Sequence, residues 1–239
     1  MFDIIYAYIK KTIILGKLTK INISMVLYKK LNLCSSPLSG DYIAELMQKK
    51  DSFNEENEKK YNLYKHLYAS DEIEKYISPV LLKQLSDINV KPAIFVNFSE
   101  YGPTHETWLH SDLTYYDDDW KPLGFGINWE LAPGETTFNW YEESSDIVHK
   151  SGSPSKNEMS MAWPRRMING VHYFNEEQLT NIGSVTFETY TAYLVRTDIP
   201  HKIISYSPGN IRKCISVRFF YEDIPTFEKA LEVFEPYYA

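Results

Sequence analysis

Three side chains of the sequence could together bind a metal ion. His110 and Asp112 lie two positions apart, and His201 follows in a distant segment, Ile199-Pro200-His201. Side chains two residues apart on a strand point to the same face, so a strand here projects His110 and Asp112 together. Two imidazoles and one carboxylate leave several metal positions open, which is typical of non-haem Fe(II) sites. These three residues are the candidate catalytic and metal-binding residues.

The His-x-Asp pair is a weak signal when it stands alone. Two residues of fixed type and spacing arise often by chance, and a single histidine is more often structural. The position of the pair in the chain strengthens the signal, because the pair precedes a series of predicted strands and His201 follows most of them. An arginine also lies a short way after His201 in the sequence, and such a site would need an arginine to bind an anionic ligand.

Two arginines are candidates for binding a carboxylate. The run from Ile211 to Phe219 reads as a strand with Arg212, Cys214, Ser216 and Arg218 on one face. An arginine that reaches into a barrel can bind a carboxylate through its two-pronged guanidinium. The alternative is a salt bridge to a surface acid, which is the commoner fate of an arginine. We favour Arg212 over Arg218 as the anchor.

The order of predicted elements is helices first and strands afterwards. Helices are predicted at 39–68, at 70–85 with a kink or a split at Pro79, and at 224–238. Runs rich in β-branched and aromatic residues, separated by turn clusters, predict strands at 93–98, 124–130, 136–141, 185–195 and 214–221. This order indicates an α+β protein whose chemistry lies in an antiparallel barrel.

Charge and cysteine content exclude some classes of function. The chain has 239 residues, with 32 acidic and 25 basic residues and a net charge of −7, which argues against binding duplex nucleic acid. Cys34 and Cys214 form no CxxC motif and cannot build a disulfide framework, so a reducing compartment fits. Lysines interrupt the apolar segment 2–33, which predicts no membrane span and no export signal. We therefore expect a cytoplasmic protein.

The order of these motifs resembles the 2-oxoglutarate-dependent Fe(II) dioxygenases. The matching features are His110-x-Asp112, strands with Gly126-Ile127-Asn128-Trp129-Glu130 and Thr136 to Tyr141, then Pro200-His201, Asn210-x-Arg212 and Ser216-Val217-Arg218-Phe219. The likeness covers roughly 91–221 and is closest to small phytanoyl-hydroxylase-like and phage-type members. It implies a double-stranded β-helix, that is, a jelly-roll or cupin-like barrel.

The resemblance also implies ligands and their residues. Fe(II) would be held by His110, Asp112 and His201, and 2-oxoglutarate would bind Arg212 as a co-substrate. Another branch of the family places its arginine nearer to Arg218, and Asn128 matches a polar position of the co-substrate pocket. Asp112 stands where halide-transferring relatives have a small residue, which favours hydroxylation.

The domain organisation predicted on this basis is one globular unit. Residues 1–90 form a mainly helical segment packed on the barrel, and 91–239 form the catalytic jelly roll with a C-terminal helix. The segment 147–183 departs from the compact pattern of the family. We interpret it as an insertion that serves as a lid or a substrate loop.

Two alternatives keep the barrel but change its function. The first is a cupin-like metal enzyme that keeps the three ligands but does not use 2-oxoglutarate. The second is a non-catalytic jelly-roll binding or structural module, since the fold alone does not fix a function. For an enzyme, we expect a small-molecule or side-chain substrate.

Overall fold

The structure is a computed structural model that describes residues 25–40, 63–68, 73–101, 104–107, 109–116, 119–132, 134–143, 161–162, 168–174, 179–207 and 211–239. The predictions for 1–24, for most of the helix at 39–68 and for most of the insertion at 147–183 lie outside these residues. Within the described part, no helix is long and apolar enough to cross a lipid bilayer.

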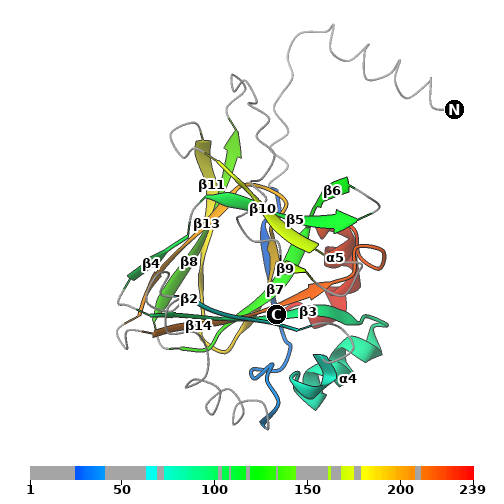
Figure 1. The fold of residues 1–239 in the computed structure, drawn as a ribbon. Helices are drawn as coiled ribbons and strands as arrows, with labels where there is room; N and C mark the ends of the chain where they lie inside the picture. The colour runs from blue at the N-terminus through cyan, green and yellow to red at the C-terminus, as the bar shows by residue number, and fades with distance from the viewer. Residues whose placement is uncertain are drawn as a thin grey trace, which may run out of the picture.

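Two antiparallel sheets form the body of the protein (Figure 1). The first runs in the order β1 (Tyr28–Leu31), β12 (Ala192–Arg196), β7 (Phe125–Glu130), β14 (Ile211–Phe219), β3 (Pro92–Tyr101) and β2 (Leu63–Tyr68). The second runs in the order β11 (Leu179–Phe187), β8 (Glu135–Glu143), β13 (His201–Tyr206), β5 (His110–Tyr116), β10 (Ile168–Tyr173) and β9 (Met161–Ala162). Two short strands complete the second sheet: β4 (Thr104–Glu106) pairs with β13, and β6 (Asp119–Pro122) pairs with β5.

The strand order is that of a jelly roll. The first sheet contains the run β12-β7-β14-β3, and the second contains the run β11-β8-β13-β5. The chain passes from one sheet to the other at almost every step, from β3 to β5, β7 and β8, and from β11 to β12, β13 and β14. Two sheets linked in this way form a double-stranded β-helix, as the sequence predicts.

Two helices cover the outer face of the first sheet (Figure 1). Helix α4 (Pro79–Asp87) begins after Ser78, whose side chain accepts a hydrogen bond from the backbone N–H of Val80. Helix α5 (Phe227–Val233) begins after Thr226, which caps it in the same manner. Short 3-10 turns precede and follow them, η1 (Ile73–Lys75) and η3 (Glu235–Tyr237).

The alternation of side chains along β14 divides the core into two parts. Ile215, Val217 and Phe219 point outward and pack against α4 and α5, together with Ile127 and Trp129 of β7. A second, smaller cluster lies between the sheets and consists of Phe138, Trp140, Phe187, Tyr193 and Val195. The inner positions of β14 therefore face the space between the sheets, where the candidate site lies.

Two predictions of local structure are corrected, and the break expected at Pro79 is confirmed. The helix predicted at 39–68 is wrong at its C-terminal end, because Leu63–Tyr68 forms strand β2, which pairs with β3. The kink or split expected at Pro79 is a split: η1 (Ile73–Lys75) ends before it and α4 begins at Pro79, since a proline at the first helical position loses no hydrogen bond. The run at 185–195 is two strands, β11 and β12, joined by a turn in which Tyr190 has a φ of 60°.

The contact between α5 and the first sheet should contribute strongly to stability. Phe234, directly after α5, is fully buried and its ring lies 5.5 Å from Phe219 and 6.4 Å from Phe125. We expect Phe234→Ala to lower the free energy of unfolding by about 3–5 kcal/mol in urea titrations, because it leaves a cavity. Val80→Ala, at a side chain that is 58% exposed, should change it by no more than about 0.5 kcal/mol. Equal effects of the two changes would contradict this packing.

Candidate metal centre

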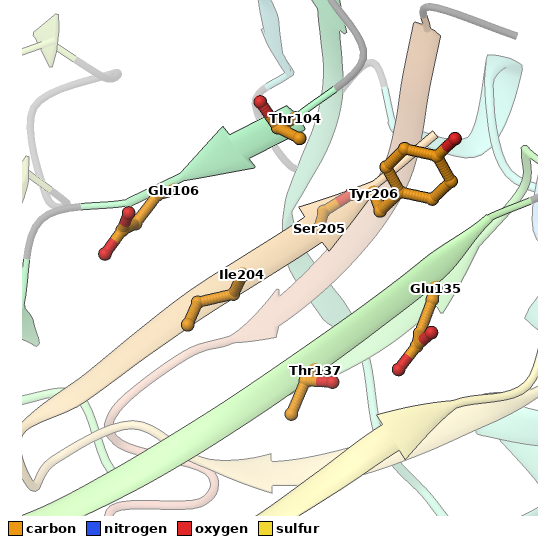
Figure 2. Close-up of a pocket in the computed structure, with 7 residues that line it drawn as sticks. All are labelled: Thr104, Glu106, Glu135, Thr137, Ile204, Ser205 and Tyr206. Carbon is orange, nitrogen blue, oxygen red and sulfur yellow. The ribbon is translucent and has the colours of Figure 1, made fainter. Parts of the chain in front are cut away.

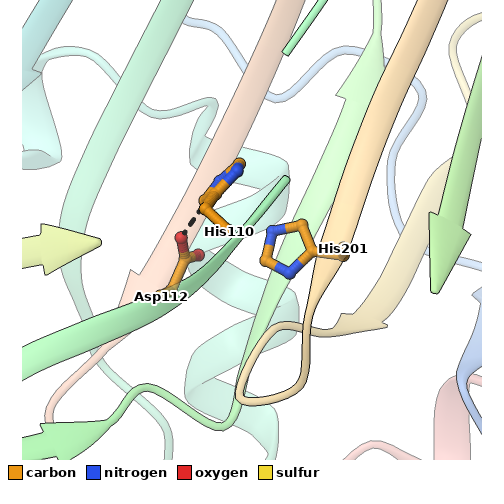
Figure 3. Close-up of side chains that lie close together, drawn as sticks. All are labelled: His110, Asp112 and His201. Atoms are coloured by element: carbon orange, nitrogen blue, oxygen red, sulfur yellow. Dashed lines mark ion pairs between the residues drawn. The ribbon is translucent and has the colours of Figure 1, made fainter. Parts of the chain in front are cut away.

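The three predicted ligands come together on the inner face of the second sheet (Figure 3). Strand β13 lies between β8 and β5, and its first residue, His201, is paired with Trp140 on one side and with His110 on the other. Residues directly opposite in neighbouring strands have their side chains on the same face. Asp112 follows two residues after His110 and points to that face as well. The sheet register therefore joins His201 to the His-x-Asp pair.

The distances between the ligand atoms suit a single metal ion. One ligand atom from each of His110, Asp112 and His201 lies within 4.8 Å of the other two. Nε2 of His110 is 3.7 Å from Oδ1 of Asp112, and the two imidazole rings are 4.4 Å apart. The side chains of His110 and Asp112 remain 17% and 14% exposed, whereas His201 is buried. A donor set of two imidazoles and a carboxylate fits a divalent transition metal.

His201 is held in the form that can bind a metal. Its Nδ1 lies 3.0 Å from the carbonyl oxygen of Ile199, and since a carbonyl only accepts, Nδ1 carries the proton. The lone pair is therefore on Nε2. The ring stacks on Phe138 at 4.8 Å. Burial, with the nearby His110, lowers the pKa of His201 to about 3, so the imidazole is neutral at physiological pH.

Asp112 is held by Arg218 of the opposite sheet. Nη2 of Arg218 lies 2.8 Å from Oδ2 of Asp112, and Nη1 donates to Oγ1 of Thr197 at 3.3 Å. The predicted co-substrate residue Arg218 thus reaches the inner face, but in this structure its partner is a candidate metal ligand. The guanidinium lies against the backbone of β7 at Gly126, where a Cβ would be 2.6 Å from Cζ of Arg218.

Asn128 also lies on the inner face, as the resemblance implies. It is 4% exposed and is paired in register with Ser216 of β14, which is 1% exposed. Within the described residues, Oδ1 of Asn128 and Oγ of Ser216 have no hydrogen-bond partner. A buried polar atom without a partner costs about 1–3 kcal/mol, and such atoms are common where a ligand binds.

Arg212 is buried on the same face, farther along β14 from Arg218. Its Nη2 lies 2.5 Å from Oε1 of Glu130, and both side chains are 4% exposed. Glu130 was not among the predicted site residues. Its two-residue spacing from Asn128 in a strand of otherwise mostly apolar residues was a usable signal, because it places the carboxylate on the inner face. Thr197 gave no such signal, since its role depends on contacts with distant strands.

A hollow in the described surface lies elsewhere (Figure 2). It has a volume of about 450 Å³ and is lined by Thr104, Glu106, Glu135, Thr137, Ile204, Ser205 and Tyr206. Ile204 and Tyr206 are exposed and alternate with the inward-facing positions of β13 that begin at His201. This hollow is therefore on the outer face of the second sheet and is separate from the candidate metal centre.

Comparisons with known proteins add little to this description. No family model and no curated protein matches the chain. Among solved structures, a vicilin from Corylus avellana (hazelnut) is 10% identical, with 67% of this chain and 29% of that chain covered and a TM-score of 0.30. A structure of the vicilin from Solanum melongena is 10% identical, with 80% of this chain and 42% of that chain covered and a TM-score of 0.34. A second structure of this vicilin is 8% identical, with 73% of this chain and 39% of that chain covered and a TM-score of 0.31. The chain spans less than half the length of these proteins, and at such values the fold assignment rests on its own strand order.

The buried, neutral state of His201 predicts a pH dependence of stability in the metal-free protein. The unfolded chain protonates this histidine near its ordinary pKa of 6.5, whereas the folded chain does so near 3. The unfolded state therefore binds more protons between these values, and stability that is intact above pH 6.5 is lost as the pH falls. Between pH 7 and pH 4, urea titrations should show the wild type losing up to about 3 kcal/mol more than His201→Gln. Parallel curves for the two proteins would contradict the burial of a neutral histidine.

Proposed function

We propose that this chain is a non-haem Fe(II) oxygenase that uses 2-oxoglutarate and hydroxylates a small-molecule or side-chain substrate. The observation that carries the proposal is the convergence of His110, Asp112 and His201 on the inner face of a jelly roll. These three residues would hold Fe(II) and leave further coordination positions for a co-substrate and oxygen. Such a metal supplies the redox chemistry that amino-acid side chains lack.

The residues around the three ligands support this role. The hydrogen bond from His201 to the carbonyl of Ile199 orients the ring, and its low pKa means that metal binding does not compete with a proton on this nitrogen. The aromatic cluster around Phe138 fills the neighbouring part of the barrel interior. It excludes water from the side of the site next to His201, which a reaction with a reactive intermediate requires.

The inner face of β7 and β14 supports the choice of 2-oxoglutarate. Ser216 and Asn128 lie between Arg218, which touches the Asp112 ligand, and the buried Arg212. The Ser216 hydroxyl can donate to a carboxylate or keto oxygen, and rotation of the Asn128 amide presents a donor as well. We propose that these groups contact the co-substrate while Arg212 binds its far carboxylate.

One observation favours a second candidate, a metal enzyme of the same fold that does not use 2-oxoglutarate. The guanidinium of Arg212 already has a carboxylate partner in Glu130, and both groups are buried. A second carboxylate brought to this pair would be repelled by Glu130, and the repulsion is strong where water is scarce. Glu130 therefore opposes the binding of 2-oxoglutarate at Arg212.

Anaerobic titration with Fe(II), with and without 2-oxoglutarate, tests the proposal. We expect the weak visible charge-transfer band of the metal-bound co-substrate in the wild type and no band in Asp112→Ala. Arg212→Gln should weaken 2-oxoglutarate binding about 10- to 100-fold, the value of one or two charged hydrogen bonds, and leave iron affinity unchanged.

Lys213→Gln is the matched control for Arg212→Gln. Lys213 is the exposed neighbour on the same strand, so its replacement removes one positive charge from the opposite face and should leave the band unchanged. Iron binding without a band would favour the enzyme that does not use 2-oxoglutarate. A wild-type protein that binds no iron would contradict both enzymes and leave a non-catalytic jelly roll.

A further inference from the structure

The segment between β12 and β13 touches two of the three candidate ligands. The carbonyl oxygen of Ile199 accepts the hydrogen bond from His201, and the carbonyl oxygen of Thr197 accepts one from the backbone N–H of Asp112 at 2.9 Å. Thr197 is fully buried, and its own N–H donates to the carbonyl of Gly124 at 3.1 Å. This segment is therefore a shared support for both sides of the metal centre.

The Thr197 hydroxyl closes a ring of contacts around Asp112. Its Oγ1 donates to the carbonyl of Leu123 at 2.6 Å and accepts from Nη1 of Arg218 at 3.3 Å. Arg218 in turn holds Oδ2 of Asp112 at 2.8 Å, and the Leu123 N–H donates to the Asp112 carbonyl at 2.9 Å. Each of these residues has its position fixed by at least two of the others.

Contacts with α5 and with the buried Trp140 also hold this segment in place. Nε and Nη2 of Arg196 donate to the two carboxylate oxygens of Asp198 at 2.8 and 3.1 Å, and Nη1 lies 2.8 Å from Oε1 of Glu228 in α5. Its carbonyl oxygen accepts from Nε1 of the buried Trp140 at 2.8 Å. Thr197 thus sits in a segment that is anchored on both sides and has little freedom to adapt.

We propose that Thr197 is a positioning residue that orients the Asp112 carboxylate through Arg218. The guanidinium binds Oδ2, whereas Oδ1 lies 3.7 Å from Nε2 of His110 and would be the oxygen that binds the metal. The absence of a side chain at Gly126 leaves room for the guanidinium between Thr197 and Asp112. This proposal rests on the metal site of the proposed function but is independent of 2-oxoglutarate.

Anaerobic titration with Co(II), followed by visible absorption, tests this role without any catalytic turnover. Thr197→Val keeps the shape of the side chain and removes the hydroxyl, and should weaken Co(II) affinity about 10-fold, the lower end of what such supporting groups contribute. It should also change the cobalt spectrum, because the carboxylate is free to turn. Thr197→Ser, which keeps the hydroxyl, should restore both.

Two further variants separate this role from a general effect on folding. Gly126→Ala leaves Thr197 and Asp112 intact but places a methyl group where the guanidinium lies, so it should weaken Co(II) binding to a similar degree. Thr137→Val is the matched control: it removes a hydroxyl that contacts Thr186 on the outer face, and binding should be unchanged.

The outcomes distinguish the two proposals. A wild-type protein without Co(II) affinity contradicts the metal site itself and with it the proposed function. A wild type that binds Co(II) together with a Thr197→Val variant that binds equally well overturns the positioning role alone. Should Thr197→Val fail to fold by circular dichroism, Gly126→Ala decides: unchanged affinity and spectrum in this variant overturn the role of the guanidinium.

Discussion

The register of β13 between β8 and β5 is the constraint on which the candidate metal centre depends. His110 and Asp112 are neighbours in sequence, but His201 joins them only because its Cα is paired with that of His110. Side chains alternate between the faces of a sheet, so a slip of one residue would turn His201 to the outer face. The packing of Phe138 against the His201 ring and the anchored segment from Arg196 to Pro200 both favour this register. The apolar core thus helps to bring the three candidate ligands together.

The interior of the barrel is divided into an apolar part and a polar part. The apolar part surrounds Phe138 and Trp140 and is filled by side chains. The polar part follows the inner faces of β7 and β14 and contains a buried ion pair, Arg212 with Glu130. Among the described residues, Oδ1 of Asn128 and Oγ of Ser216 there have no hydrogen-bond partner. Burial of such groups opposes folding unless something binds them, and proteins keep such costs mainly at functional sites. The proposed function places its ligands in the polar part.

The sequence predicted those parts of the site that depend on local periodicity. The two-residue repeat placed His110 with Asp112 and put Arg212, Ser216 and Arg218 on one face of β14, and the structure agrees. It could not supply the partners of these side chains, because Glu130 and Thr197 meet them through pairings between distant strands. For the same reason the end of the predicted helix at 39–68 was wrong: Leu63–Tyr68 becomes a strand only by pairing with β3. Local patterns predicted many of the elements, but pairing between distant strands decided the contacts and, at Leu63–Tyr68, the element itself.

The most direct test of a metal centre at these residues is anomalous diffraction from crystals soaked anaerobically in Mn(II). The three-residue site predicts one strong anomalous peak bounded by Nε2 of His201, a ring nitrogen of His110 and Oδ1 of Asp112. It also predicts that Arg218 stays on Oδ2 of Asp112 beside the peak. The absence of a peak there, or a peak only among exposed acidic side chains, would contradict the account and leave the three residues as a structural cluster.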